Sequence, residues 1–111
     1  MEKSHELVLF TYGITNSFPK KELFSLTDQM TRATISITSN IAEGFSRYSY
    51  KEKIRFYSIA LGLLTELQSQ FSVVRDIKYI KREKYIIFFD KSILVHKLIN
   101  KLIKYSKNRY T

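Results

Sequence analysis

The chain contains very few residues that interrupt regular backbone structure: one proline and three glycines among 111 residues. Proline and glycine punctuate turns, and a sandwich or barrel of short strands needs many of them. With 44% apolar residues, the chain also has enough hydrophobic material for a packed core, unlike a disordered segment. The sequence therefore predicts one all-α domain over residues 1–111, built from a few long helices.

Four segments carry apolar residues at helical spacing, separated by short breaks. The spacing predicts helices over about 4–17, 25–45, 49–78 and 82–107. Pro19 ends the first helix, because proline pushes the preceding residue out of the α region. Short breaks make consecutive helices pack antiparallel. The predicted architecture is an antiparallel up-down-up-down four-helix bundle.

Capping signals mark the starts of two helices. Ser25 offers its hydroxyl to the free N–H groups of the second helix. The run from Ser49 to Glu52 matches a capping box, which gives the third helix the clearest start. The end of the second helix is open: Gly44 stops it, or it continues to Arg47 with the glycine packed closely against a neighbour.

The third helix carries two apolar stripes. The first stripe comprises Tyr57, Ala60, Leu64, Leu67, Phe71 and Val74. The second stripe, beside it, comprises Phe56, Ile59, Leu63, Val73 and Ile77. Because one bundle core requires only one stripe, we expect this helix to be central in the fold or to contact another subunit on its outer side.

The fourth helix combines an apolar stripe with a basic face. The stripe is predicted at Phe88, Lys91, Val95, Leu98, Leu102 and Tyr105. On the opposite face lies a lysine ridge, which comprises Lys97, Lys101, Lys104 and Lys107. This ridge is the most concrete nucleic-acid-binding surface in the sequence, and Arg82 and Lys84 add positive charge at the start of the same helix.

The positive charge is concentrated in the last third of the chain. The formal net charge is +9, and residues 78–111 hold ten Lys and Arg against two acids. Such an excess predicts attraction to polyanions, such as nucleic acid or anionic lipid. A solvated lysine-rich helix face, common in AT-rich bacterial genomes, explains the same pattern, so both interpretations stay open.

The sequence offers little for catalysis or for membrane insertion. Cysteine is absent, which excludes disulfides and thiolate metal sites and suits a reducing cytoplasm. Glu2 and His5 have the spacing of a di-iron ligand pair, but His96 has Ile93 where a second glutamate is needed. No signal core or membrane span is visible. We therefore expect a soluble cytoplasmic protein that is no enzyme and binds no metal or cofactor.

The second helix carries a polar stripe beside its apolar stripe, which comprises Leu26, Met30, Ala33, Ile37 and Ile41. The polar stripe comprises Gln29, Arg32, Ser36, Ser39, Asn40, Glu43 and Arg47. In one interpretation, small residues let helices approach while the larger polar groups satisfy one another or a neighbouring helix. In the other, the stripe binds a ligand or nucleic acid. We favour the first; if the stripe faces another subunit, it fixes the geometry of assembly.

The same helix carries a family resemblance, centred on the run Ser39-Asn-Ile-Ala-Glu-Gly44. The matching positions around it are Phe18, Pro19, Leu26, Thr27, Gln29, Arg32, Ala33, Ser36, Ile37, Phe45, Arg47, Phe56, Ile59, Ala60, Gly62, Glu66 and Leu67. With these residues the chain resembles the four-helix-bundle family labelled 23S rRNA intervening-sequence proteins. It departs from the family at Thr38, usually proline, and at Leu63, commonly serine. Thr38 removes a kink or first-turn feature, so the second helix should be straighter or start earlier.

The resemblance implies an antiparallel bundle that assembles as a homopentamer with a central channel. The chain is also similar to the accessory variability protein of diversity-generating retroelements, a bundle whose basic pentamer binds nucleic acid and a reverse transcriptase. The leading hypothesis is a non-enzymatic oligomer that binds RNA or DNA through phosphates. The alternative is a pentameric scaffold or adaptor for a protein partner, such as a reverse transcriptase. Membrane binding is disfavoured, because the lysine ridge lacks an exposed apolar face dedicated to lipid.

Overall fold

The computed structural model describes residues 1–110, which form four α-helices and no β-strand. The helices are α1 (Glu2–Thr15), α2 (Leu26–Ser46), α3 (Tyr50–Asp76) and α4 (Arg82–Tyr110). A short 3-10 helix, η1 (Lys20–Glu22), lies in the connection between α1 and α2. The prediction of an all-α chain with four helices is confirmed, and the predicted bounds differ from the observed ones by about three residues or fewer.

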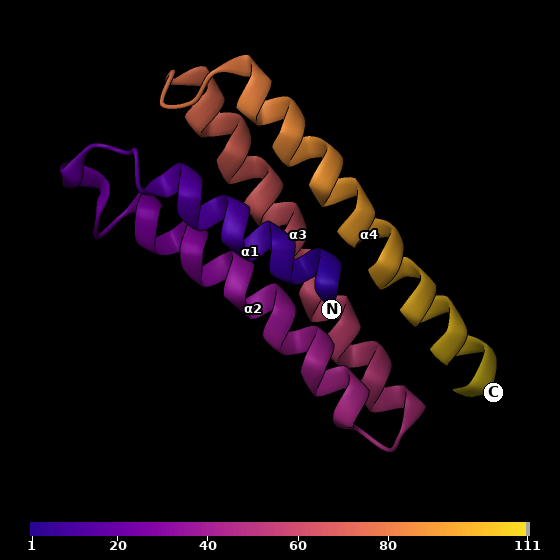
Figure 1. The fold of residues 1–111 in the computed structure, drawn as a ribbon. Helices are drawn as coiled ribbons and strands as arrows, with labels where there is room; N and C mark the ends of the chain where they lie inside the picture. Colours follow the sequence, from indigo (N-terminus) through magenta and orange to yellow (C-terminus); the bar gives the residue numbers. More distant parts are fainter. Residues whose placement is uncertain (111) are drawn as a thin grey trace.

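The helices lie lengthwise beside one another in a body of 48 × 25 × 20 Å (Figure 1). Each helix packs against the next along the chain, and α1 also packs against α4. The α2–α3 connection and the C-terminus lie at one end of the molecule, which we call the α2–α3 end. The α1–α2 and α3–α4 connections lie at the other, the α3–α4 end. Since α1 has 14 residues and α4 has 29, α1 covers only the part of α4 nearer the α3–α4 end.

The core takes one stripe of side chains from each helix. On α3, every residue of the first predicted stripe is buried. On α2, four of the five predicted apolar residues are buried, and Leu26 is half-buried. The rings of Phe71 and Phe88 stack at a centroid distance of 3.7 Å and join α3 to α4. Helical spacing alone therefore identified the core faces of these two helices.

On α4, the predicted stripe is partly wrong. Phe88 and Val95 are buried as predicted, but Ser92, Ile99 and Ser106 complete the stripe. Two predicted members, Leu98 and Tyr105, follow Lys91 at intervals of seven residues and so lie on its side of the helix. That side faces α1, because the Lys91 amine lies 5.9 Å from the centroid of the Phe10 ring. Since α1 is too short to continue along α4, Tyr105 remains 52% exposed.

The helix ends follow the sequence signals with one exception. The Ser49 hydroxyl accepts the Glu52 N–H at 3.3 Å, as predicted for the start of α3. Ser25 occupies the cap position of α2, but its hydroxyl donates to the Glu22 carboxylate at 2.7 Å, so its predicted capping bond is wrong. Gly44 lies inside α2, which is continuous across Thr38, and packs against the Tyr57 ring. Of the two endings left open, the continued helix is the observed one.

A lysine in the left-handed region ends α3. Lys78 has φ of 66°, and its N–H donates to the Arg75 carbonyl at 3.1 Å. The Tyr79 N–H donates to the Val74 carbonyl at 2.9 Å. This pair of hydrogen bonds is the Schellman motif, in which glycine normally occupies the left-handed position because a Cβ atom is strained there.

Candidate nucleic-acid interface

The lysine ridge lies on the solvent side of α4, and all four of its lysines are exposed. Ten residues separate its first and last members, which is about 15 Å of helix. Among residues 1–110 the salt bridges are Arg32–Asp28, Arg47–Glu43 and Arg75–Asp76. The ridge lysines therefore have no acidic partner in this part of the chain. The structure brings together four of the six basic residues that were predicted to bind nucleic acid.

The other two, Arg82 and Lys84, lie at the α3–α4 end and do not join the ridge. Thirteen residues, or about 20 Å of helix, separate Lys84 from Lys97. Lys84 lines a cavity of about 530 Å³ between α1 and the α3–α4 connection. Arg82 lines another cavity, of about 620 Å³, together with Arg75 and Lys78. The six candidate residues therefore do not form one continuous basic surface along α4.

The outer face of α4 between these basic groups is apolar. Its large apolar side chains are 41–47% exposed; they are Ile86, Ile87, Phe89 and Leu94. This apolar face reaches the ridge, because Leu94 lies one turn before Lys97. Three residues of the second stripe predicted for the third helix are 40–46% exposed: Ile59 and Val73 in α3, and Ile77, which caps it. The remaining two, Phe56 and Leu63, are half-buried.

The polar stripe of α2 finds its hydrogen-bond partners within α2 itself. The Arg47 guanidinium donates to the Glu43 carboxylate at 2.9 Å, which pairs two members of the stripe. Arg32 donates to Asp28 at 3.0 Å, and the Asn40 amide donates to the Ser36 carbonyl at 2.8 Å. One pair of stripe residues thus satisfies each other, whereas within residues 1–110 no side-chain hydrogen bond runs from this stripe to a neighbouring helix.

Part of the stripe borders a shallow cavity beside α3. This cavity of about 210 Å³ is lined by Gln29, Arg32, Ala33, Ser36, Leu63 and Glu66. Ser36 is half-buried there, whereas Ser39 and Gln29 are exposed. The stripe therefore lies at the solvent-accessible edge between α2 and α3.

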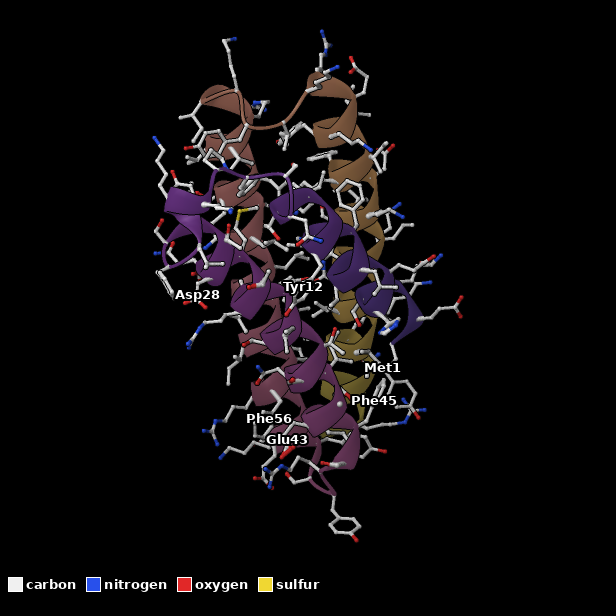
Figure 2. All side chains as sticks on the ribbon, turned by 60° about the vertical axis from the view of Figure 1, so that its left-hand side comes forward. Met1, Tyr12, Asp28, Glu43, Phe45 and Phe56 are labelled. Atoms are coloured by element: carbon white, nitrogen blue, oxygen red, sulfur yellow. The ribbon has the colours of Figure 1, made fainter. Side chains whose placement is uncertain are left out.

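Two cationic side chains connect α2 to α3 at the α2–α3 end, where Figure 2 places Glu43, Phe45 and Phe56. The Arg47 guanidinium lies 4.8 Å from the centroid of the Phe56 ring, a cation–π contact that joins α2 to α3. The Lys53 amine donates to the carbonyls of Gly44 and Phe45, both at 3.0 Å. It thus brings a cationic donor to the last carbonyls of α2, at the negative end of the helix dipole. Lys53 was not identified from the sequence. A lysine one turn into a helix that follows a short connection can indicate a contact with the end of the preceding helix.

At the α3–α4 end, a hydrogen-bonded group joins the two connections. The Tyr79 hydroxyl donates to the Glu22 carboxylate at 2.6 Å, and the Phe18 ring lies 5.3 Å from the Tyr79 ring. The hydrogen bond from Tyr79, followed by that from Ser25, holds the pKa of Glu22 below its usual range. The same carboxylate raises the pKa of Tyr79. Sequence reasoning missed this contact, because its partners lie 57 residues apart.

The structure shows no metal-binding group and no membrane helix in the residues that it describes. Among residues 1–110, no three His, Asp or Glu side chains cluster as metal ligands would. His5 is exposed and His96 is half-buried. No helix within this range combines the length and the apolar character that a bilayer crossing needs.

Comparisons with known proteins give a family and a similar fold. The family model described as 23S rRNA-intervening sequence protein matches residues 1–101. The chain is similar to the crystal structure of a protein with unknown function from the S23 ribosomal protein family of Bacteroides thetaiotaomicron, with a TM-score of 0.85 and 26% identity. That similarity covers 93% of this chain and 96% of the other. Comparison with curated proteins gives no match.

Proposed function

Since the chain belongs to the 23S rRNA-intervening sequence protein family, we propose that it is a non-enzymatic, oligomeric protein that binds RNA or DNA through α4. The observation that carries the proposal is the lysine ridge, with four exposed amines along about 15 Å of one helix face. The phosphates of one duplex strand are spaced about 3.4 Å apart along the helix axis, so a ridge of this length spans about four of them.

Contacts of this kind hold the nucleic-acid backbone rather than its bases. Each phosphate that a lysine neutralises releases condensed counterions, which makes the affinity fall as salt rises. Lysine is a flexible point charge, so the ridge supplies no geometry that distinguishes one base sequence from another. Binding should therefore depend steeply on salt and little on sequence.

We also propose that the bundle has up-down-up-down topology and assembles as a homo-oligomer, with the pentamer as the expected form. The exposed Ile59 and Val73 of α3 and the exposed Ile77 that caps it support this, because they recur on one side of the helix where a second subunit could cover them. Light scattering at micromolar concentration tests it. A mass several times 13.2 kDa is expected, whereas a mass of 13.2 kDa contradicts the assembly.

A filter-binding experiment tests the binding proposal. The variant carries Lys97→Glu, Lys101→Glu and Lys104→Glu, which together reverse three charges of the ridge. The matched control reverses three exposed lysines elsewhere, at Lys3, Lys20 and Lys21. We expect the ridge variant to lose most of its affinity for RNA and the control to lose little, because only the ridge contacts phosphates. Equal losses would show that net charge, and not the ridge, governs binding.

The apolar outer face of α4 favours a second candidate function, a scaffold or adaptor for a protein partner such as a reverse transcriptase. Ile86, Phe89 and Leu94 offer the large apolar side chains that form the centre of protein–protein interfaces. A complex that survives nuclease treatment, and that Leu94→Asp disrupts, supports this function. A complex that nuclease dissolves supports nucleic-acid binding. Both proposed functions assume that the protein is located in the cytoplasm.

A further inference from the structure

The α2–α3 end of the bundle brings together tyrosines from three segments of the chain. Tyr48, in the α2–α3 connection, is fully exposed. Tyr105 and Tyr110, in the last turns of α4, are 52% and 53% exposed. Tyr50 begins α3, and its ring lies 6.5 Å from the Tyr105 ring. Three exposed tyrosines and the half-buried Tyr50 thus lie at the end where Figure 1 places the C-terminus.

The same end is strongly basic. Residues 43–58 and 97–110 hold nine Lys and Arg but only two acids, Glu43 and Glu52. Two of these cations serve the fold, since Arg47 pairs with Glu43 and Lys53 binds the last carbonyls of α2. The other seven include the whole lysine ridge, and the Arg109 guanidinium lies 3.6 Å from the centroid of the Tyr105 ring.

Two of these tyrosines, Tyr48 and Tyr105, contribute little to the packing of the core. Tyr48 is fully exposed, so its side chain buries no surface in the described residues. Tyr105 lies on the side of α4 that α1 leaves uncovered, and because Arg109 covers one face of its ring, a base would stack on the other face. Exposed aromatic faces surrounded by cations are what proteins use to bind single-stranded nucleic acid, because each ring stacks on a base while the cations hold the phosphates.

We propose that the α2–α3 end binds unpaired nucleotides, with bases stacked on Tyr48 and Tyr105 and the backbone held by the lysine ridge. This inference rests on the proposed nucleic-acid binding and adds a ligand class to it. Bases inside a duplex already stack on one another, so only a strand, loop or bulge offers a free base face. Phosphate contacts alone predict the opposite preference, since a duplex has the higher charge density.

Fluorescence anisotropy with two labelled probes tests the proposal. One probe is a single-stranded oligouridine and the other is an RNA duplex of the same length. We expect wild type to prefer the single strand. Tyr48→Ala should weaken binding of the single strand by roughly 5- to 150-fold, the range for losing one stacked base, and leave duplex binding unchanged. The control Tyr12→Ala removes a partly exposed tyrosine from α1, at a distance from the α2–α3 end, and should change neither affinity.

A spectroscopic readout adds to the affinities, because the chain contains no tryptophan and its emission comes from tyrosine. Oligouridine should quench this emission in wild type, and less so in Tyr48→Ala and in Tyr105→Leu. Three results would overturn the stacking inference alone. They are equal wild-type affinity for both probes, an unchanged affinity of Tyr48→Ala for the single strand, and a loss of oligomer mass in Tyr48→Ala. No binding of either probe by wild type would overturn the proposed function itself.

Discussion

The close contact between Gly44 of α2 and the Tyr57 ring of α3 makes a strong prediction about stability. A Cβ atom on residue 44 would lie 2.8 Å from Tyr57 Cδ1 and 3.0 Å from Tyr57 Cζ. Tyr57 is 2% exposed, so its ring cannot move aside into solvent. Gly44→Ala should therefore force the two helices apart or the ring out of its preferred rotamer, although alanine is the better helix former.

Gly62 provides a matched control for this substitution. It lies within α3, is exposed, and has open space where a Cβ atom would be. Gly62→Ala should stabilise the protein by about 1 kcal/mol through helix propensity alone. Because Gly44→Ala gains the same propensity, the difference between the two variants isolates the steric term, which is about 1–3 kcal/mol for overpacking a filled core.

Chemical denaturation of both variants measures this difference directly. We expect Gly44→Ala to unfold at lower denaturant concentration than Gly62→Ala, with similar m-values. Combining Gly44→Ala with Tyr57→Leu should recover part of the steric cost, because a smaller side chain leaves room for the methyl group. Equal stabilisation by Gly44→Ala and Gly62→Ala would refute the close approach of α2 and α3 at this point.

Three further predictions concern the helix ends and connections. Lys78→Gly should raise the free energy of unfolding by about 1 kcal/mol in thermal melts, because glycine adopts the left-handed conformation without strain, whereas Lys78→Ala should bring no such gain. Lys53→Met should lower stability by about 1 kcal/mol, since it removes the cation from the last carbonyls of α2, while Lys51→Met, at an exposed position, should have little effect. The pKa of Glu22 is lowered in the folded protein, so its hydrogen bond from Tyr79 stabilises the fold at pH values above the ordinary carboxyl pKa of 4.5. This stabilisation is lost as the pH falls through the lower pKa that Glu22 has in the folded protein. The stability difference between wild type and Tyr79→Phe, measured by denaturant titration across the acidic range, should therefore shrink as the pH falls, and a constant difference would contradict this assignment.

The spacing of apolar residues identified the buried face of a helix where all the buried positions are apolar, and misplaced it where some of them are polar. On α3 all six residues of the first stripe are apolar, so their spacing identified the core face correctly. On α4 the buried stripe includes Ser92 and Ser106, which a search for apolar residues passes over. The Ser92 hydroxyl is satisfied within the core, since it donates to the Phe89 carbonyl at 2.8 Å and accepts from the Gln68 amide at 3.3 Å. The apolar stripe of α4 was therefore predicted on the side of the helix next to the buried one.

Some features of the candidate site could likewise be predicted from the sequence, and others depend on the fold. Exposure of the lysine ridge follows from the spacing of four residues on one helix, which is local information. The approach of Tyr50 to Tyr105 depends on how the start of α3 meets the end of α4, and the two rings are 55 residues apart in sequence. The separation of Arg82 and Lys84 from the ridge follows from the length of α4, and the exposure of Tyr105 follows from the shortness of α1.

The salt dependence of RNA binding tests the central claim most directly. The measurement compares the slope of log Kobs against log salt concentration for wild type and for a variant with Lys97→Gln, Lys101→Gln and Lys104→Gln. Each phosphate contact contributes about −0.7 to −0.9 to this slope, so we predict that the variant's slope is shallower by about 2 to 3 for each ridge engaged. An unchanged slope would contradict the assignment of the lysine ridge as the phosphate-binding surface.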